Sequence, residues 1–139
     1  MDGRITGSID RGLVAFVGTT HGDDFAIARD LARRVASYRM FPDADGRTNC
    51  SVREVGGAVL VVSQFTLYAN TRKGTRPSFV AAGEPTRARQ LVDHFQAGLE
   101  EEGIPTAAGV FGATMEVDLV NEGPFTILLE KEHKIPAAT

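Results

Sequence analysis

The segment that most constrains the fold is a short aliphatic run in the middle of the chain. Residues 58–62 read Ala-Val-Leu-Val-Val and follow directly on Gly56-Gly57. Their β-branched content and short length favour a strand, and the lack of polar alternation predicts that the strand is buried on both faces. A strand of this kind lies inside a sheet that other layers cover, so we expect the rest of the chain to build those layers.

Five further strands are expected around this one. A second apolar run at 13–17, between two glycines, predicts another buried strand. Turn residues at 42–46 predict a hairpin, which contributes two short strands. Apolar residues alternate with acidic ones at 115–119, which predicts a half-exposed strand, and the last strand is expected at 125–130.

Two helices are interleaved with these strands. Apolar residues recur at helical spacing from Phe25 onward, after a turn at 21–24 that supplies an N-cap. The second helix begins near Pro85 and stops at Gly103, and the polar segment 69–83 before it is expected to be a loop. The 139 residues are therefore predicted to form a single mixed α/β domain with layered sheets, about six strands and two long helices.

Composition and charge exclude several classes of protein. The lone Cys50 forms neither an internal disulfide framework nor a cysteine metal cluster. Fifteen basic residues face eighteen acidic ones, a net charge of −3, so the chain is not a polycation that wraps nucleic acid, although a local basic patch can still bind phosphate. The N-terminus has no signal-peptide core and no apolar run is long enough to span a bilayer, so we expect a cytoplasmic protein without a membrane partner.

The common side-chain chemistries find no support in the sequence. The three histidines, at 21, 94 and 133, are not in the pattern of a catalytic triad, and no spacing matches a zinc motif. Lys73-Gly74-Thr75 has the letters of a phosphate-binding loop in the wrong order, and no dinucleotide fingerprint follows a strand. A site made of standard catalytic side chains is therefore not predicted.

Two stretches remain as candidate sites. The first is Ser63-Gln64-Phe65-Thr66-Leu67, at the end of the central strand. Strand alternation places Gln64 and Thr66 on one face, and Ser63 and Phe65 on the other. Polar residues at this position form either a solvent-facing strand end or part of a binding site.

A basic loop follows the first stretch, and the second stretch lies near the C-terminus. The cations Arg72, Lys73 and Arg76 suit either a solvated loop or a contact with a phosphate backbone. Residues 121–126 read Asn-Glu-Gly-Pro-Phe-Thr and form either a hairpin turn or a close approach of the main chain to a ligand. The Gly123-Pro124 bond is a position at which a cis peptide is energetically accessible.

These stretches together resemble the D-aminoacyl-tRNA deacylase family. Its two signatures, SQFTL and NxGPxT, match residues 63–67 and 121–126 in order and approximate separation. Further family-like segments are found at 12–18, at 76–79 and at 111–113 with Met115, so the resemblance covers nearly the whole chain.

The resemblance implies an esterase that cleaves a D-amino acid, and sometimes glycine, from the terminal ribose of tRNA, as proofreading in translation. It implies no metal or cofactor, and its partner is the aminoacylated 3′ end of tRNA rather than DNA. It also implies a homodimer with the active site near the subunit interface, where a cis Gly123-Pro124 segment of one subunit enters the pocket of the other and excludes L-amino acids. In this picture Asn121 and Thr126 hold that segment in shape, and Met115 belongs to the same substrate-binding group.

The remaining site residues are assigned in the same way. The candidate catalytic residues that line the ester pocket are Ser63, Gln64, Phe65 and Thr66, and the candidate tRNA contacts are Arg72, Lys73 and Arg76. Ester hydrolysis needs a stabilised oxyanion, which backbone N–H groups can provide without a special side chain. Because no general base accompanies Thr66, we interpret it as a positioning residue rather than a nucleophile.

The expected domain spans residues 1–130, followed by a polar tail at 131–139. Family members usually begin with an additional strand ahead of the segment that matches Asp2-Gly3. Either the true start lies upstream of Met1, or a sheet edge is left unpaired, and in the second case we expect lower stability or altered dimer packing. Two other functions are retained at this point. One is a non-catalytic module that binds the end of aminoacyl-tRNA, and the other is a dimeric metabolite-binding protein.

Overall fold

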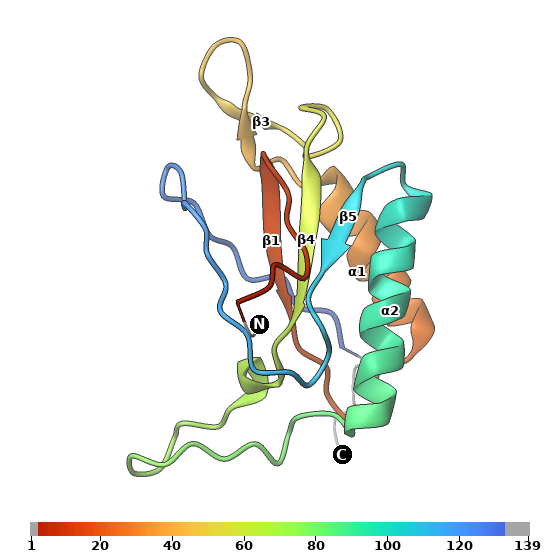
Figure 1. The fold of residues 1–139 in the computed structure, drawn as a ribbon, viewed down its shortest axis with the longest axis vertical. Helices are drawn as coiled ribbons and strands as arrows, with labels where there is room; N and C mark the ends of the chain where they lie inside the picture. The colour runs from red at the N-terminus through yellow and green to blue at the C-terminus, as the bar shows by residue number, and fades with distance from the viewer. Residues whose placement is uncertain (1–2, 133–139) are drawn as a thin grey trace, which may run out of the picture.

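The computed structural model describes residues 3–132, which form two sheets and two long helices (Figure 1). The elements in chain order are β1 (Gly12–Val17), α1 (Phe25–Ser37), β2 (Phe41–Pro42), β3 (Thr48–Cys50), β4 (Ala58–Ser63), the 3₁₀ turn η1 (Phe65–Tyr68), α2 (Pro85–Glu101) and β5 (Thr106–Ala108). The mixed α/β prediction is confirmed, and both predicted helices and the hairpin at 42–46 are present.

The main sheet has three parallel strands in the order β1-β4-β5. Gly12 pairs with Ala58 at one end of the β1–β4 ladder, and Val17 pairs with Ser63 at the other. Because strand order follows chain order, two right-handed crossover connections place both helices on the same face of the sheet. Figure 1 shows α1 and α2 on that common side.

The hydrophobic core lies between this sheet face and the two helices. Val59 and Val61 of β4 are almost completely buried there, against Phe95 and Leu99 of α2. Small residues allow the helices to approach each other closely, since a Cβ built on Gly98 lies 2.8 Å from the Cβ of Ala32. The glycine is therefore required by the helix crossing rather than by backbone conformation.

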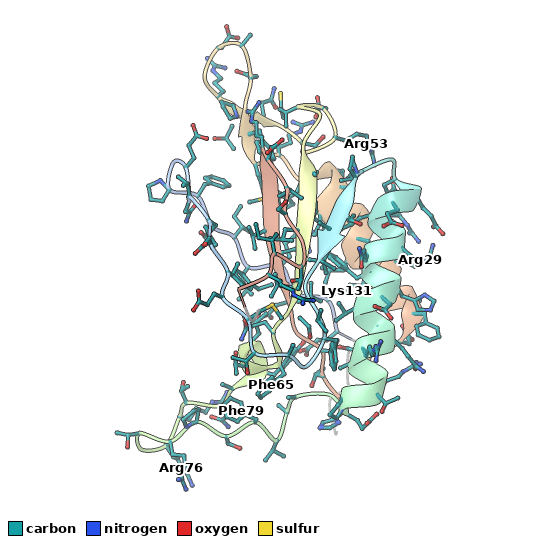
Figure 2. All side chains as sticks on the ribbon, in the orientation of Figure 1. Arg29, Arg53, Phe65, Arg76, Phe79 and Lys131 are labelled. Atoms are coloured by element: carbon teal, nitrogen blue, oxygen red, sulfur yellow. The ribbon has the colours of Figure 1, made fainter. Side chains whose placement is uncertain are left out.

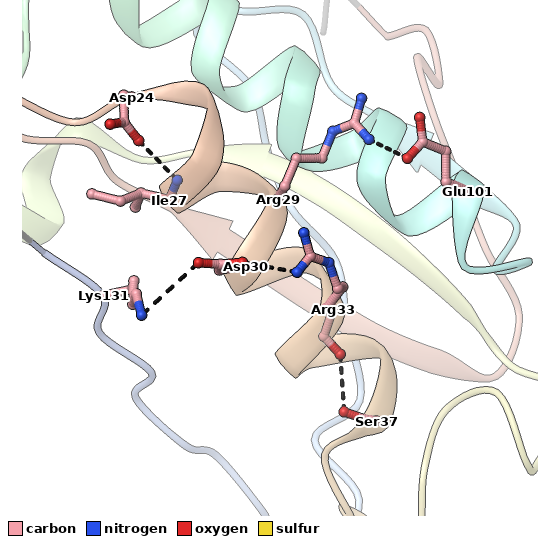
Figure 3. Close-up of polar contacts among 8 residues, drawn as sticks. All are labelled: Asp24, Ile27, Arg29, Asp30, Arg33, Ser37, Glu101 and Lys131. Carbon is pink, nitrogen blue, oxygen red and sulfur yellow. Dashed lines mark hydrogen bonds and ion pairs between the residues drawn. The ribbon is translucent and has the colours of Figure 1, made fainter.

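Polar contacts fix the ends and the exposed side of α1 (Figure 3). The Asp24 carboxylate accepts from the backbone N–H of Ile27 at 2.9 Å, as an N-cap does. Arg29 pairs with Glu101, which links α1 to the end of α2. Asp30 pairs with Arg33 at 2.9 Å, and with Lys131 at 3.9 Å on the C-terminal segment.

The expected burial of β4 on both faces holds only in part. Val59 and Val61 are buried under the helices, and Val62 on the other face is buried as well, whereas Leu60 on that same face is half-buried. That other face is covered by irregular chain from the C-terminal part of the molecule rather than by a second helical layer (Figure 1).

Two predicted strands, at 115–119 and 125–130, are wrong, and β5 was not predicted. Within residues 3–132, neither of the two segments forms a ladder with another strand. A strand requires a hydrogen-bonded neighbour in addition to a suitable side-chain pattern. The pattern itself persists, because Met115 and Val117 are half-buried while Glu116 between them is exposed.

The predicted tail at 131–139 lies mostly outside the described residues. Its two described members, Lys131 and Glu132, contact the domain through Asp30 and Tyr68 respectively. In the part of the chain that the structure describes, neither helix has the length and apolar character needed to cross a bilayer.

The Gly98–Ala32 contact generates a stability prediction. Gly98→Ala should lower the free energy of unfolding by about 1–2 kcal/mol. The added methyl group pushes the helices apart, and the packing energy that this costs exceeds the energy gained from the higher helix propensity of alanine. Adding Ala32→Gly in the same chain removes the opposing methyl and should recover part of the loss. Urea denaturation measures both changes, and a Gly98→Ala variant more stable than the parent contradicts this account.

Candidate active site

A pocket of about 280 Å³ opens at the carboxyl ends of β4 and β5, where α2 passes over the sheet. It is lined by residues from the two strands, from α2 and from the segment after β5: Val61, Ser63, Arg89, Val92, Asp93, Gln96, Ala108, Gly109, Val110, Phe111 and Met115. Ligands of open parallel sheets bind at this edge as a rule. The pocket contains two of the residues that were predicted from the sequence, Ser63 and Met115.

The helix side of the pocket is polar and the sheet side is mostly apolar. Arg89, Asp93 and Gln96 project from successive turns of α2, whereas Phe111 and Met115 contribute apolar surface. The sequence analysis missed the three helical residues. A signal for them existed, because they are spaced by four and three positions and form one stripe beside the apolar stripe of the helix.

Beside the pocket the chain turns, and this brings Gln64 and Thr66 together. The predicted alternation past Ser63 is wrong, because the strand ends there and Leu67 N–H donates to Gln64 C=O at 3.2 Å to start η1. In this turn the Gln64 side-chain amide donates to the Thr66 hydroxyl at 2.5 Å. Since the Thr66 oxygen accepts this bond, its own proton remains available for donation to a bound group.

The first two N–H groups of η1 are unused. Among residues 3–132, the N–H groups of Phe65 and Thr66 donate no hydrogen bond. Both residues are exposed. Paired main-chain donors at the start of a turn can bind an oxygen that carries negative charge.

The predicted tRNA contacts lie on a long loop that starts directly after η1. Asn70 and Ser78 exchange two backbone hydrogen bonds of 2.7 and 2.9 Å, and the rings of Phe65 and Phe79 pack edge to face with centroids 5.3 Å apart. Figure 2 shows Arg76 at the tip of this loop, away from the body of the domain. Arg72 and Lys73 are also exposed.

The predicted 121–126 segment is a separate projecting loop. Its Gly123-Pro124 peptide bond is cis, as was predicted. Asn121 donates to the Thr126 hydroxyl at 2.9 Å and accepts from the Phe125 N–H at 3.1 Å, so one side chain spans the turn. In Figure 1 this loop and η1 lie at different ends of the molecule, so one chain does not bring the two predicted signatures together.

Tyr68, at the end of η1, ties the site region to the C-terminal segment. Its hydroxyl donates to a Glu132 carboxylate oxygen at 3.0 Å. Burial, and then the hydrogen bond and charge of Glu132, raise the pKa of the phenol well above its ordinary value of 10.0. The neutral phenol is therefore the form that the fold favours.

In the described range, no three His, Cys, Asp or Glu side chains come together in a way that could hold a metal ion. The polar groups near the pocket are main-chain N–H groups, amides, hydroxyls and the Arg89 and Asp93 side chains. Such groups can orient and polarise an ester, and they include no evident nucleophile–base pair.

Comparisons with known proteins agree on one family. The model of the D-Tyr-tRNA(Tyr) deacylase family matches residues 1–130. A D-aminoacyl-tRNA deacylase of Thermomicrobium roseum is 53% identical over 130 residues, which are 94% of this chain and 84% of that protein. One of Alcanivorax borkumensis is 49% identical over 94% of this chain and 90% of that protein. The solved structure of the c-Myc DNA Unwinding Element Binding Protein superimposes with a TM-score of 0.82 at 31% identity, covering 90% of this chain and 85% of that one.

The environment of Tyr68 generates a pH prediction. The chain has two tyrosines and no tryptophan, so in Tyr38→Phe the tyrosinate absorbance reports on Tyr68 alone. Its titration midpoint should lie above 10.0 in the folded protein, and Glu132→Gln should lower it. The stability that comes from the raised pKa is complete below about pH 10 and is lost as the pH rises toward the folded value. A midpoint at or below 10.0 in the folded protein would contradict the described environment.

Proposed function

Since the chain belongs to the D-Tyr-tRNA(Tyr) deacylase family, we propose that it hydrolyses the ester bond of D-aminoacyl-tRNA and releases free D-amino acid and tRNA. The structural observation that carries this proposal is the turn at 63–66, where two free main-chain N–H groups stand beside a pocket at the sheet edge. The alternative of a non-catalytic module that binds the end of aminoacyl-tRNA is not favoured, because relatives with 53% and 49% sequence identity to this chain are named as deacylases.

The chemistry follows from the groups at the turn. The Phe65 and Thr66 N–H groups bind the carbonyl oxygen of the ester and stabilise the negative charge that develops when water attacks. The Gln64 amide fixes the Thr66 hydroxyl, which is left to donate its proton to the substrate or to the attacking water. No base accepts that proton within the described site, so Thr66 positions rather than attacks, and the 2′-hydroxyl of the terminal ribose is the natural partner for proton transfer.

Discrimination between D- and L-amino acids is assigned to residues 121–126 of a second copy of the chain. The two enantiomers differ only in where the side chain points from Cα, so a rigid main-chain wall close to Cα rejects the wrong one by steric clash. The Asn121 bonds to Thr126 and Phe125 provide that rigidity. The separation of this loop from η1 within one chain supports an arrangement in which it serves the partner's pocket.

The same assignment gives the remaining predicted residues their roles. Ser63 and Met115 lie in the pocket and contact the aminoacyl end, and Phe65, two residues after Ser63, packs on Phe79 of the basic loop. The loop cations contact phosphates of the acceptor end of the tRNA. We place the activity in the cytoplasm, where aminoacyl-tRNA is consumed in translation, and it requires no cofactor in this scheme.

The direct test is deacylation of matched D- and L-tyrosyl-tRNA by the purified protein. Release of D-tyrosine should be much faster than release of L-tyrosine. Thr66→Val should lower kcat about tenfold to a hundredfold, because it removes the hydroxyl that donates to the substrate or to the attacking water and leaves both main-chain donors in place, whereas loss of a true nucleophile costs about 10⁴-fold or more. The proposed function is wrong if this protein leaves D-tyrosyl-tRNA intact under conditions in which an active relative hydrolyses it.

The two-subunit arrangement has its own test. Gly123 has φ +123°, and a Cβ there meets the Phe125 nitrogen at 3.1 Å, so Gly123→Ala displaces the loop. This variant should cleave L-tyrosyl-tRNA about tenfold faster than the parent does. Mixing it with an excess of the double variant Gln64→Ala/Thr66→Val, whose own turnover is impaired and whose 121–126 loop is intact, should restore the rejection of L-tyrosine. If mixing does not restore the rejection of L-tyrosyl-tRNA, the 121–126 loop acts on the pocket of its own chain.

A further inference from the structure

The cations that lack a partner are concentrated in one part of the chain. Most other arginines are engaged: three pair with carboxylates, one bonds an amide and three lie over aromatic rings. Within residues 3–132, the basic side chains for which no hydrogen bond, ion pair or ring contact exists are Arg47, Arg72, Lys73, Arg76 and Arg89. Four of these five lie between positions 72 and 89.

The charge of the chain is divided in the same way. Residues 69–89 contain five basic side chains and one acidic one, whereas the rest of the sequence contains ten basic and seventeen acidic residues. A polyanion is therefore attracted to this segment and repelled by the rest of the molecule. An acidic protein with one positive segment has a single favourable place for a phosphate backbone.

The positive segment leads from the loop tip to the pocket. Arg76 is at the tip of the loop, which runs back along the lower edge of the molecule to the first turn of α2 (Figures 1 and 2). Arg89 is exposed, stands one turn into this helix and lines the pocket. The cations thus mark a path that ends at the proposed site of hydrolysis.

The N-terminus of α2 is itself not available to a phosphate. The Glu84 carboxylate accepts from the N–H groups of Thr86 and Arg87 at 2.9 and 3.0 Å, and Pro85 has no N–H. These bonds hold the pKa of Glu84 below its usual range, so the cap stays negatively charged. Arg87 lies over the Phe25 ring, 4.3 Å from its centroid. A phosphate near this end of the helix must therefore be met by the side chain of Arg89.

We propose that Arg89 is a phosphate-binding residue at the mouth of the pocket and that, with the cations at 72–76, it guides the single-stranded 3′ end of the tRNA into the site. The inference rests on the proposed function and deepens it. It names the ligand group, a phosphodiester next to the terminal nucleotide, and the side chain that binds it.

The test compares two substrates that share the same ester: D-tyrosyl-tRNA, and D-tyrosyl-adenosine, which has no phosphate. Arg89→Glu should lower kcat/KM on the tRNA about tenfold at low salt, mainly through KM, and should reduce the slope of log kcat/KM against log salt by about 0.7. The loss on D-tyrosyl-adenosine should be several-fold smaller. Arg47→Glu is the matched control, because it makes the same charge change on an unpartnered arginine in the β2–β3 hairpin at the opposite end of the molecule, and it should behave like the parent.

Two outcomes overturn the inference. One is that Arg89→Glu lowers kcat/KM equally on both substrates, and the other is that Arg47→Glu lowers kcat/KM on the tRNA as much as Arg89→Glu does. The failure of the proposed function looks different, since the parent protein would then cleave neither substrate. In that case fluorescence anisotropy with deacylated tRNA still tests Arg89, because Arg89→Glu should reduce the slope of the logarithm of the binding constant against log salt in the same way. Duplex DNA of similar length serves as a further probe, and equally tight binding of this DNA through Arg89 would overturn the assignment to the tRNA end.

Discussion

The pairing of β4 with β1 is the constraint on which the rest of the structure depends. At the start of the ladder the strands lie so close together that a Cβ on Gly12 would overlap the Ala58 carbonyl group, so this register requires glycine. The two strands then run in step and end together at Val17 and Ser63. The chain that leaves β4 must therefore turn at that edge, and this turn is η1. One register thus fixes the place of the candidate site.

The elements that the sequence predicted well are those whose signals are local. The first helix begins where an Asp cap meets helical spacing, and the second begins at Pro85 and ends before Gly103. β5 has only three small residues and becomes a strand because β4 offers it an edge. The opposite holds for segment 115–119, which has the side-chain pattern of a strand and no paired neighbour in the described range. Pairing is a long-range property that side-chain alternation does not report.

The candidate site was found from short motifs, and its remaining parts could be found only from the fold. Ser63 and Met115 were predicted from family-like segments, and both line the pocket. Arg89 and Asp93 line the pocket because of the way α2 passes over the sheet edge, and the periodicity of the helix does not determine this placement. Alternation placed Gln64 and Thr66 on one face, but the strand ends at Ser63, so the contact between the two side chains is made by the η1 turn and not by a strand face.

The unused N–H groups of Phe65 and Thr66 have a consequence for how such a site can be inhibited or labelled. Every residue except proline carries an N–H, so substitution of either side chain by another ordinary amino acid leaves both donors in place as long as the turn forms. Electrophilic reagents that trap activated serine or cysteine nucleophiles are unsuited to this site, because the Ser63 and Thr66 hydroxyls have no base beside them among the described residues. A stable mimic of the tetrahedral intermediate, a phosphonate for example, offers the charged oxygen that these donors fit, so reversible anions rather than covalent warheads are the suitable starting point for chemical probes.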